Sequence, residues 1–285
     1  MLRRLRLSFL ALALPLAACP PRDKPDDSGD SDPGGETGDP VGEVQAEQGL
    51  YVEDGPGDLD RLSDGRVLVV TRYGGHVLAW TQGIDGYDTY ERSIAGIEGI
   101  FVGPDDTTWA AVSDGGIVGA VGWLEDSELV TVATQADDGT LFRYPRDLTL
   151  APDGQLLMAD ATVGALFRSD PTSGATTAYY VDIASPRTLL FLDDTLYVGG
   201  SDGVYQVEYP GSAATRVDSR EAWGLLEYDG RILVTNSEQK VFELGGASIG
   251  GAEIDRPGAL LAIDDTLHIS DLGGRYLWSL ALAAR

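Results

Sequence analysis

Short apolar runs alternate with polar turns along most of the chain, from about residue 56 to the C-terminal end. Six of these turns contain Asp-Gly or Asp-Asp-Thr between two apolar runs, which is the pattern of a β-hairpin. The turns are Asp64-Gly65-Arg66, Asp105-Asp106-Thr107, Asp153-Gly154-Gln155, Asp193-Asp194-Thr195, Asp229-Gly230-Arg231 and Asp264-Asp265-Thr266. They recur about every 40 residues, and no stretch shows sustained helical periodicity. A repeat of this length with several strands per unit predicts an all-β protein, a six-bladed β-propeller.

The order of apolar runs within each unit predicts its strands. The run before the turn is expected to be a buried inner strand, the run after it a second strand, and a third strand follows a Gly-rich loop. A weaker outer strand completes the unit, as in residues 178–181. Blade six ends after its third strand, whereas a strand-like segment at residues 49–53 precedes blade one. This N-terminal segment is therefore expected to complete blade six and close the ring, which removes exposed strand edges from a domain of residues 47–285.

The residues before the repeats have a different composition. A basic start and an apolar run too short to span a bilayer predict a signal peptide over residues 1–18. The run ends at Leu16-Ala17-Ala18-Cys19, which resembles the lipobox of bacterial lipoproteins, so Cys19 is the expected lipidation site. The alternative is an ordinary secretory signal with an incidental cysteine. Residues 19–46 are rich in Gly, Pro and Asp and predict a disordered acidic tether.

The charge of the chain limits its partners. The formal net charge of −26 argues against binding nucleic acid, because such a surface repels a phosphate backbone. Anionic lipid head groups are repelled in the same way, so membrane contact is expected only through the lipid anchor. Together with the lipobox, these features predict a monomeric, lipid-anchored protein of the bacterial cell envelope, on the periplasmic or the cell-surface side.

The repeats also carry a family resemblance. Several begin with Pro, any residue, Gly or Asp, and Leu, as in Pro56-Gly57-Asp58-Leu59 and Pro145-Arg146-Asp147-Leu148. Each unit resembles the NHL-type repeat, and the set of six is similar to the calcium-dependent lactonase propellers of the gluconolactonase family. The resemblance covers about residues 47–285 and implies a fold that receptors, scaffolds, lactonases and quinone dehydrogenases share. The family's calcium site needs two Asn, but Asn236 is the only Asn in the chain, which counts against lactonase chemistry.

The residue after each blade-start Pro, or its equivalent, is expected at one mouth of the central channel. These residues are Gly57, Glu98, Arg146, Arg187, Trp223 and Gly258. The first hypothesis is that Arg146 and Arg187 clamp the carboxylate or phosphate of a small anionic ligand. Trp223 would then be a stacking wall, with Glu98 beside the clamp. The alternative is structural, with both arginines joining neighbouring blades through acidic partners among Glu98, Asp147, Asp160 and Asp202.

A metal in the channel is a further hypothesis. Calcium is favoured because it prefers hard oxygen ligands. The predicted ligands are Asp58, Asp160, Asn236 and Asp271. The alternative is that Asp160 and Asp271 cap the following loops through hydrogen bonds to the backbone. No other cofactor is expected, and His268 is interpreted as a hydrogen-bonded packing residue.

These features favour a binding function, in which the channel face takes a protein partner or a small anionic ligand. The alternative is an enzyme, a calcium-dependent hydrolase of lactones or esters. In that case a channel metal would polarise the carbonyl and an Asp at the mouth would act as general base. An enzyme of this kind needs oxygen ligands that converge in the channel, so the single Asn and the scattered acids favour binding.

Overall fold

A computed structural model describes residues 45–84, 86–91, 94–180, 182–209, 213–238 and 240–282. The chain divides into two compact units, residues 1–40 and 41–285, and all described residues belong to the second. The predicted signal peptide, Cys19 and all but two residues of the predicted tether lie outside the described residues. The described part of the chain contains no helix that is long and apolar enough to cross a membrane.

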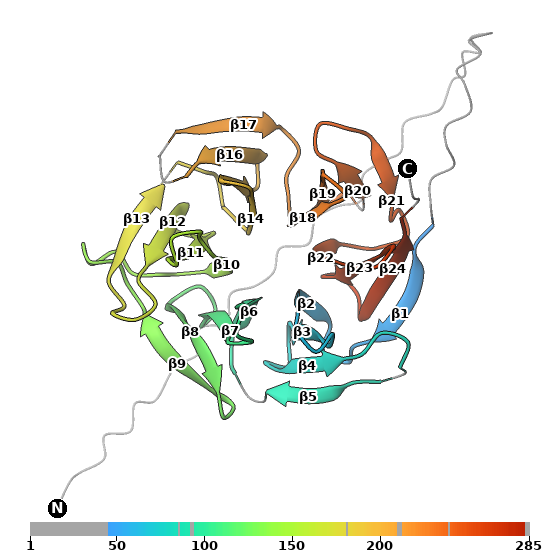
Figure 1. Cartoon of the computed structure of the whole chain (residues 1–285), viewed down its shortest axis with the longest axis horizontal. Coiled ribbons are helices and arrows are strands. Elements are labelled where there is room, and N and C mark those ends of the chain that lie inside the picture. Colours follow the sequence, from blue (N-terminus) through green and yellow to red (C-terminus); the bar gives the residue numbers. More distant parts are fainter. Residues whose placement is uncertain are drawn as a thin grey trace, which may run out of the picture. The chain divides into compact units, whose positions relative to one another are not determined.

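Six four-stranded antiparallel sheets follow one another around a ring, as Figure 1 shows. Blades one and two are β2 (Pro56–Arg61), β3 (Val67–Thr71), β4 (Val77–Trp80) and β5 (Asp88–Glu91), then β6 (Ile97–Val102), β7 (Thr108–Ser113), β8 (Gly119–Glu125) and β9 (Glu128–Ala133). Blades three and four are β10 (Pro145–Leu150), β11 (Leu156–Asp160), β12 (Ala165–Ser169) and β13 (Thr176–Tyr180), then β14 (Thr188–Leu192), β15 (Thr195–Gly199), β16 (Val204–Glu208) and β17 (Ala214–Asp218). Blades five and six are β18 (Gly224–Tyr228), β19 (Arg231–Asn236), β20 (Lys240–Glu243) and β21 (Ser248–Gly250), then β22 (Pro257–Ile263), β23 (Thr266–Asp271), β24 (Tyr276–Ala281) and β1 (Glu47–Tyr51). The predicted six-bladed β-propeller is therefore confirmed.

The repeated Asp turns have a left-handed backbone. Asp229 and Gly230 both have positive φ, 52° and 71°, as the central residues of a type I′ hairpin require. Asp193 and Asp264, each the first residue of its turn, have φ of 52° and 50°. Asp tolerates this conformation better than most residues with a side chain, so the repeated phrase encodes the hairpins locally.

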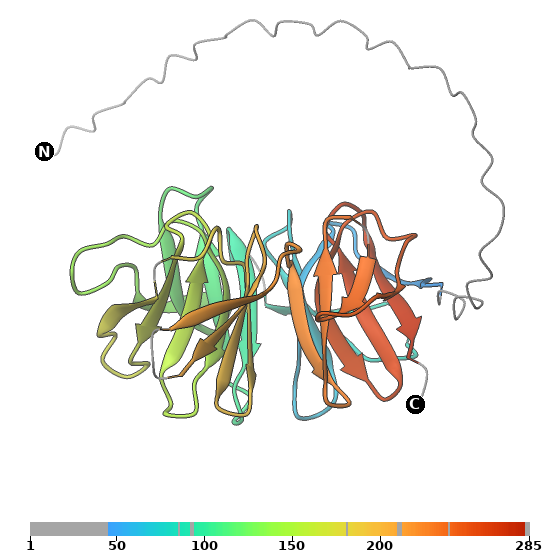
Figure 2. The same ribbon diagram turned by 90° about the horizontal axis from the view of Figure 1, so that it is seen from above.

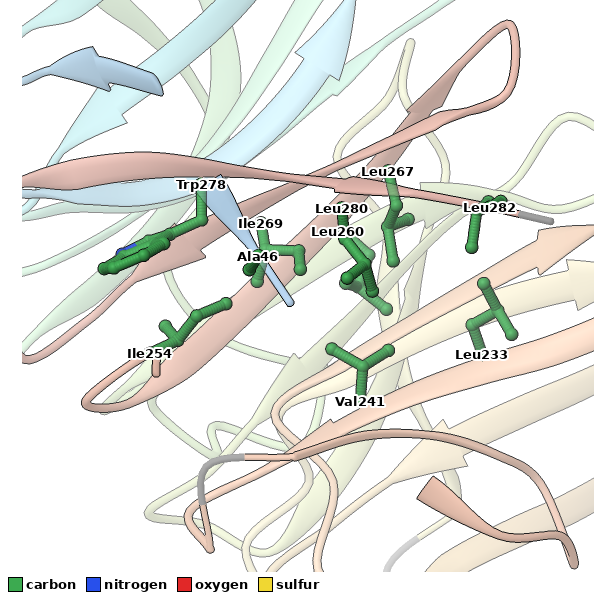
Figure 3. Packing of buried hydrophobic residues seen from close by; sticks show 10 residues of the cluster. All are labelled: Ala46, Leu233, Val241, Ile254, Leu260, Leu267, Ile269, Trp278, Leu280 and Leu282. Carbon is green, nitrogen blue, oxygen red and sulfur yellow. The ribbon is translucent and has the colours of Figure 1, made fainter. Parts of the chain in front are cut away.

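The apolar core lies between blades. In the described part of the chain, each of the six interfaces between neighbouring blades contains one cluster of buried apolar side chains. At the interface of blades five and six, Leu233 and Val241 pack with Leu260 and Leu267 (Figure 3). A second strand such as β3 is covered on both faces, which explains why all five of its residues are apolar or buried. Burial of one such side chain contributes about 1.5–3 kcal/mol, so blade packing is the main source of stability.

The first described strand lies in the same sheet as the last. β1 pairs antiparallel with β24, and Tyr51 lies opposite Tyr276. Val52, directly after β1, is fully buried, and its backbone N–H donates to the carbonyl of Arg275 at 2.7 Å. The outer strand of blade six therefore comes from the N-terminal side of blade one, which the sequence predicted from the number of strands in the last repeat.

His268 is a buried packing residue at the interface of blades six and one. Its ring lies edge-on to Trp80, with ring centroids 5.1 Å apart, and its Nδ1 is 3.2 Å from the hydroxyl of Ser279. No hydrogen-bond partner for Nε2 is found among the described residues. Burial disfavours the imidazolium and lowers the pKa of His268 from its usual 6.5 to about 4.

Acid is therefore expected to destabilise the fold through His268. A histidine that is harder to protonate when folded contributes full stability above pH 6.5 and loses it as the pH falls toward 4. At pH 4.5 the loss is roughly 2–3 kcal/mol. The replacement His268→Leu, which places in blade six the residue type of blades one and three, should remove this component. Urea midpoints of the parent and of His268→Leu at pH 7.5 and 4.5 measure this component. If the midpoint falls equally in both proteins, the acid sensitivity does not come from His268.

Candidate functional site

The central channel contains a cavity of about 200 Å³ at the end where the inner strands begin. This end is the mouth of the channel. Pro145 at the start of β10 lies opposite Asp160 at the end of β11, so the loops after the second strands lie on the mouth face. Figure 2 shows the blades from the side, with loops of neighbouring blades gathered along opposite faces of the ring.

Bulges in the inner strands direct side chains into the cavity. The pairing of β10 with β11 shifts between Pro145 and Asp147, and Arg146 and Asp147 both line the cavity although they are consecutive. Regular strands place consecutive side chains on opposite faces, and a bulge adds an unpaired residue that redirects them. Similar shifts occur at the mouth ends of β2, β6 and β22.

The predicted ligand-binding residues meet at the mouth. Arg146, Arg187, Trp223 and Glu98 all line the same cavity. The guanidinium carbon of Arg187 lies 3.8 Å from the ring centroid of Trp223, and that of Arg146 lies 5.8 Å from the same ring. Both distances are within the range of a cation–π interaction. The indole is therefore shared by two arginines from neighbouring blades.

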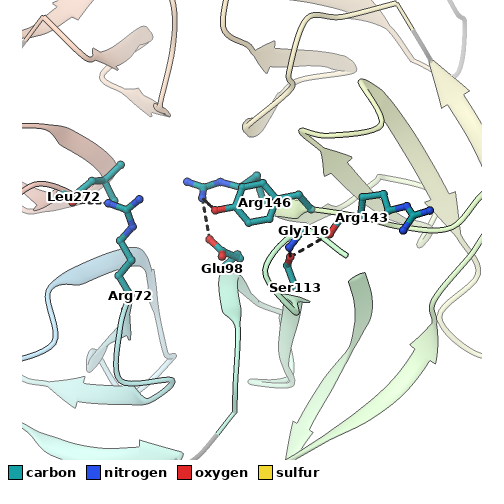
Figure 4. Close-up of polar contacts among 8 residues, drawn as sticks. Arg72, Glu98, Ser113, Gly116, Arg143, Arg146 and Leu272 are labelled. Carbon is teal, nitrogen blue, oxygen red and sulfur yellow. Dashed lines mark hydrogen bonds and ion pairs between the residues drawn. The ribbon is translucent and has the colours of Figure 1, made fainter. Parts of the chain in front are cut away.

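Both arginines are also paired with glutamates. Arg146 Nη1 donates to Glu98 Oε2 at 2.8 Å and to the Tyr144 hydroxyl at 2.8 Å, as Figure 4 shows for Glu98. Arg187 Nη1 donates to Glu221 Oε2 at 3.0 Å. The arginine side chains are only 12% and 16% exposed, so these charges are poorly solvated. The structural alternative thus applies to Arg146 with Glu98, while the partner of Arg187 is a residue that the sequence did not single out.

A third arginine reaches the mouth from blade one. Arg72 lines the cavity, and its Nη1 donates to the carbonyl of Leu272 at 2.5 Å. In Figure 4 the side chains of Arg72 and Arg146 lie on either side of Glu98. Burial raises the pKa of Glu98, and the charges of Arg146 and Arg72 counteract part of this effect. Arginine charge is therefore concentrated at the mouth of a strongly acidic protein.

Deeper in the cavity, carboxyl groups bridge neighbouring blades. Asp58 Oδ2 accepts from the backbone N–H of Ile100 at 2.8 Å, and Asp147 Oδ2 accepts from that of Leu189 at 2.7 Å. Both side chains reach the cavity but are otherwise surrounded by protein. Burial therefore raises the pKa of Asp147 to about 7, and burial together with the charge of Asp147 raises that of Asp58 well above its usual value. Asp60 has the same bridging role, with Oδ2 accepting from the N–H of Val102, and burial raises its pKa.

The predicted metal ligands do not form one group. Asp58 lines the cavity, whereas Asp160 and Asp271 are buried and accept backbone N–H groups of the loops at the mouth face. Asn236 Oδ1 accepts from the N–H of Glu238 at 3.2 Å. The described residues contain no group of three or more His, Cys, Asp or Glu that would hold a metal ion. The residues present therefore do not fit the calcium site of the gluconolactonase family.

No protein-family profile matches the chain, and no curated protein matches its sequence. Solved structures do match its fold. A gluconolactonase from Xanthomonas campestris has a TM-score of 0.64 at 18% identity, over 82% of this chain and 87% of its own. The PQQ-bound aldose sugar dehydrogenase from Streptomyces coelicolor has a TM-score of 0.61 at 14% identity, over 82% and 96%. A virginiamycin B lyase from Staphylococcus aureus has a TM-score of 0.55 at 17% identity, over 80% of each chain. At these identities the similarity shows the fold, which hosts unrelated functions.

Proposed function

We propose that the propeller binds a small ligand with a carboxylate or phosphate group at the mouth of its channel. The observation that carries the proposal is the pair of arginines, Arg146 and Arg187, held over one indole at the entrance of a cavity. Planar guanidinium groups recognise carboxylate and phosphate oxygens through parallel N–H donors. The indole holds the two cations in place and offers a flat wall for the ligand.

Local attraction outweighs the negative charge of the whole protein. Charges at the surface that are more than about 8 Å from the ligand are largely screened at physiological ionic strength. The Coulomb attraction between a ligand anion and one guanidinium at contact distance is about 4 kcal/mol at an effective dielectric constant of 20, and repulsion from Glu98 and Glu221 offsets part of it. Glu98 and Glu221 already occupy one donor of each arginine, so the ligand binds beside these pairs.

The cellular setting is part of the same proposal. The lipobox supports an anchor at Cys19, and the acidic composition of residues 19–46 supports a flexible spacer between membrane and propeller. The ligand would then be a small molecule that reaches the cell envelope. A protein partner could bind the same site through an anionic group on its surface. The Cys19→Ser variant is expected to be absent from the membrane fraction, and cell fractionation measures this.

Replacing Arg146 or Arg187 by Ala is expected to weaken binding of citrate and inorganic phosphate, used as probes. Loss of a charge-assisted hydrogen bond lowers affinity by about 10-fold to 100-fold. The matched control is Arg216→Ala, because the 3.8 Å pair of Arg216 with Asp202 is exposed. Isothermal titration calorimetry gives the affinities and thermal melting the stability. If both cavity variants lose stability but bind the probes as the parent does, the arginines are structural pairs only.

A second candidate is hydrolysis of a lactone or ester. It is favoured by the carboxyl of Asp147, whose pKa of about 7 suits a general base at neutral pH, and by the fold shared with a gluconolactonase. The proton acceptor would be Asp147, and the arginines would hold the substrate's anionic group. The described residues contain no group of three or more His, Cys, Asp or Glu that would hold calcium for this reaction.

Millimolar calcium is therefore expected to leave the melting temperature unchanged relative to chelator. A ligand that binds only the folded state at a hundredfold excess over its dissociation constant stabilises it by roughly 2.7 kcal/mol, which a melting curve detects easily. Magnesium at the same concentration is the control for ionic strength. A rise specific to calcium would contradict the expectation and would direct the search to a lactone panel with metal present.

A further inference from the structure

The cavity contains carboxyl groups that have no cationic partner. Asp58, Asp60 and Asp147 line it together with the three arginines of the mouth. None of the ion pairs found in the described part of the chain includes these three residues. Arg146 and Arg187 pair with glutamates instead, and Arg72 donates to the carbonyl of Leu272. Burying a carboxylate without a counterion is costly, and burial raises the pKa of all three groups, so a cation that enters the cavity would stabilise their ionised form.

The carboxyl groups retain acceptor capacity for such a cation. Asp147 Oδ1 accepts from the N–H of Leu148 at 2.7 Å, and its Oδ2 accepts from that of Leu189 at 2.7 Å. An ionised carboxylate has about four acceptor sites, and the side chain of Thr188 uses a third on Asp147, so about one remains for a ligand. The negative charge of Asp147 disfavours ionisation of Asp58, and that of Asp60 disfavours ionisation of Asp147.

The size and remaining lining of the cavity limit the ligand. Its volume of about 200 Å³ is below the roughly 300–1,000 Å³ of pockets for drug-sized molecules. Leu59, Leu148, Leu189 and Leu225 contribute apolar surface to the lining. A ligand with a short alkyl chain suits this surface. One end of the ligand would face the arginines and the other end would face the aspartates.

We propose that the cavity binds a small zwitterion, an amino acid with a short alkyl chain. Its carboxylate lies against Arg146 and Arg187 at the mouth, and its ammonium group lies against Asp58 and Asp147 below. This inference rests on the proposed function, because the same arginines hold the anionic group. The inference adds the ammonium as a second group that the cavity recognises. It also explains why arginine and aspartate line one cavity without pairing.

Matched ligands test the proposal on the full mature chain by isothermal titration calorimetry. The first set is 4-aminobutyrate, 4-hydroxybutyrate and butyrate, and the second is β-alanine, 3-hydroxypropionate and propionate. Within each set the carboxylate is constant and only the far group changes. In at least one set the amino compound is expected to bind roughly tenfold or more tightly than the hydroxy compound and the unsubstituted acid, which is the effect of one charge-assisted contact.

Asp147→Asn separates recognition of the ammonium from folding. The variant keeps one acceptor oxygen but loses the charge, so the preference for the amino compound should disappear while butyrate affinity is retained or higher. If Asp147→Asn does not fold, as judged by its melting curve, Asp58→Asn takes its place. Hydroxy acids or plain acids that bind as tightly as the amino compounds overturn this inference and leave the proposed function standing. If none of the six compounds binds while citrate or phosphate does, the zwitterion inference falls and the proposed function stands. If citrate and phosphate also fail to bind, both fall.

Discussion

A chain that begins at residue 55 is expected to melt about 10 °C below one that begins at residue 45. The shorter chain lacks β1 and Val52, and it leaves the edge of β24 unpaired. Burial of Val52 alone contributes about 2 kcal/mol, and the lost strand pairing and Leu50 packing bring the total to about 4 kcal/mol. For a domain of this size each kcal/mol lowers the melting temperature by about 2–4 °C.

The two chains share every residue of blades one to five, so the comparison isolates the contribution of the outer strand of blade six. The longer chain is the control for removal of the N-terminal segment as such. An exposed β24 edge should also promote association, which size-exclusion chromatography detects. Equal melting temperatures would show that blade six is stable with three strands and that β1 does not contribute to ring stability.

Asp160→Ala is expected to destabilise the propeller by about 3–5 kcal/mol. Asp160 is fully buried, and its carboxylate accepts four backbone N–H groups, those of Arg143, Tyr144, Thr162 and Val163, at 2.6–3.1 Å. These donors belong to the segment before β10 and the loop after β11, so one side chain holds two loops of the mouth face together. Loss of the acceptor leaves buried donors unsatisfied at about 1–3 kcal/mol each, reduced where water replaces it.

The matched variants separate the structural role from a catalytic or metal-binding one. Asp160→Asn keeps one acceptor oxygen and should lie between the parent and the alanine variant in urea midpoint. Asp114→Ala, in the loop after β7, removes an exposed carboxylate and should be close to neutral. If Asp160→Ala keeps the parent's stability but loses affinity for the probes, the residue serves the ligand and not the loops.

Local chemistry explains what sequence reasoning predicted well. The turn at Asp229-Gly230 depends on the φ preferences of its own two residues, so its position was readable without the rest of the chain. The repeat spacing then gave the number of blades. Because the blades are equivalent, residues at matching positions of different repeats meet at the channel, and this brought Arg146, Arg187 and Trp223 into one hypothesis.

The errors of the sequence reasoning lie where contacts cross between blades or between loops. Glu221, the partner of Arg187, directly precedes the start of its repeat, whereas the hypothesis considered residues within the blade starts and after the second strands. Asp147 was weighed as a partner for an arginine, but its carboxyl bonds to the backbone of Leu189 in the next blade. Asp160 and Asp58 both carry carboxylate oxygens, but they lie at different sites. Asp160 binds backbone N–H groups of the loops, whereas Asp58 faces the cavity.

The all-β class, the six repeats and the turn positions could be predicted from the sequence, as could the positions from which Glu98, Arg146, Arg187 and Trp223 line the channel mouth. These follow from short-range conformational preferences and from periodicity, which a single chain displays directly. The tertiary structure alone decided which charges pair, which carboxyls lose their solvation, and which consecutive residues share the cavity. Those outcomes depend on bulges, on inter-blade packing and on burial, and all three arise only when distant segments are brought together in the ring.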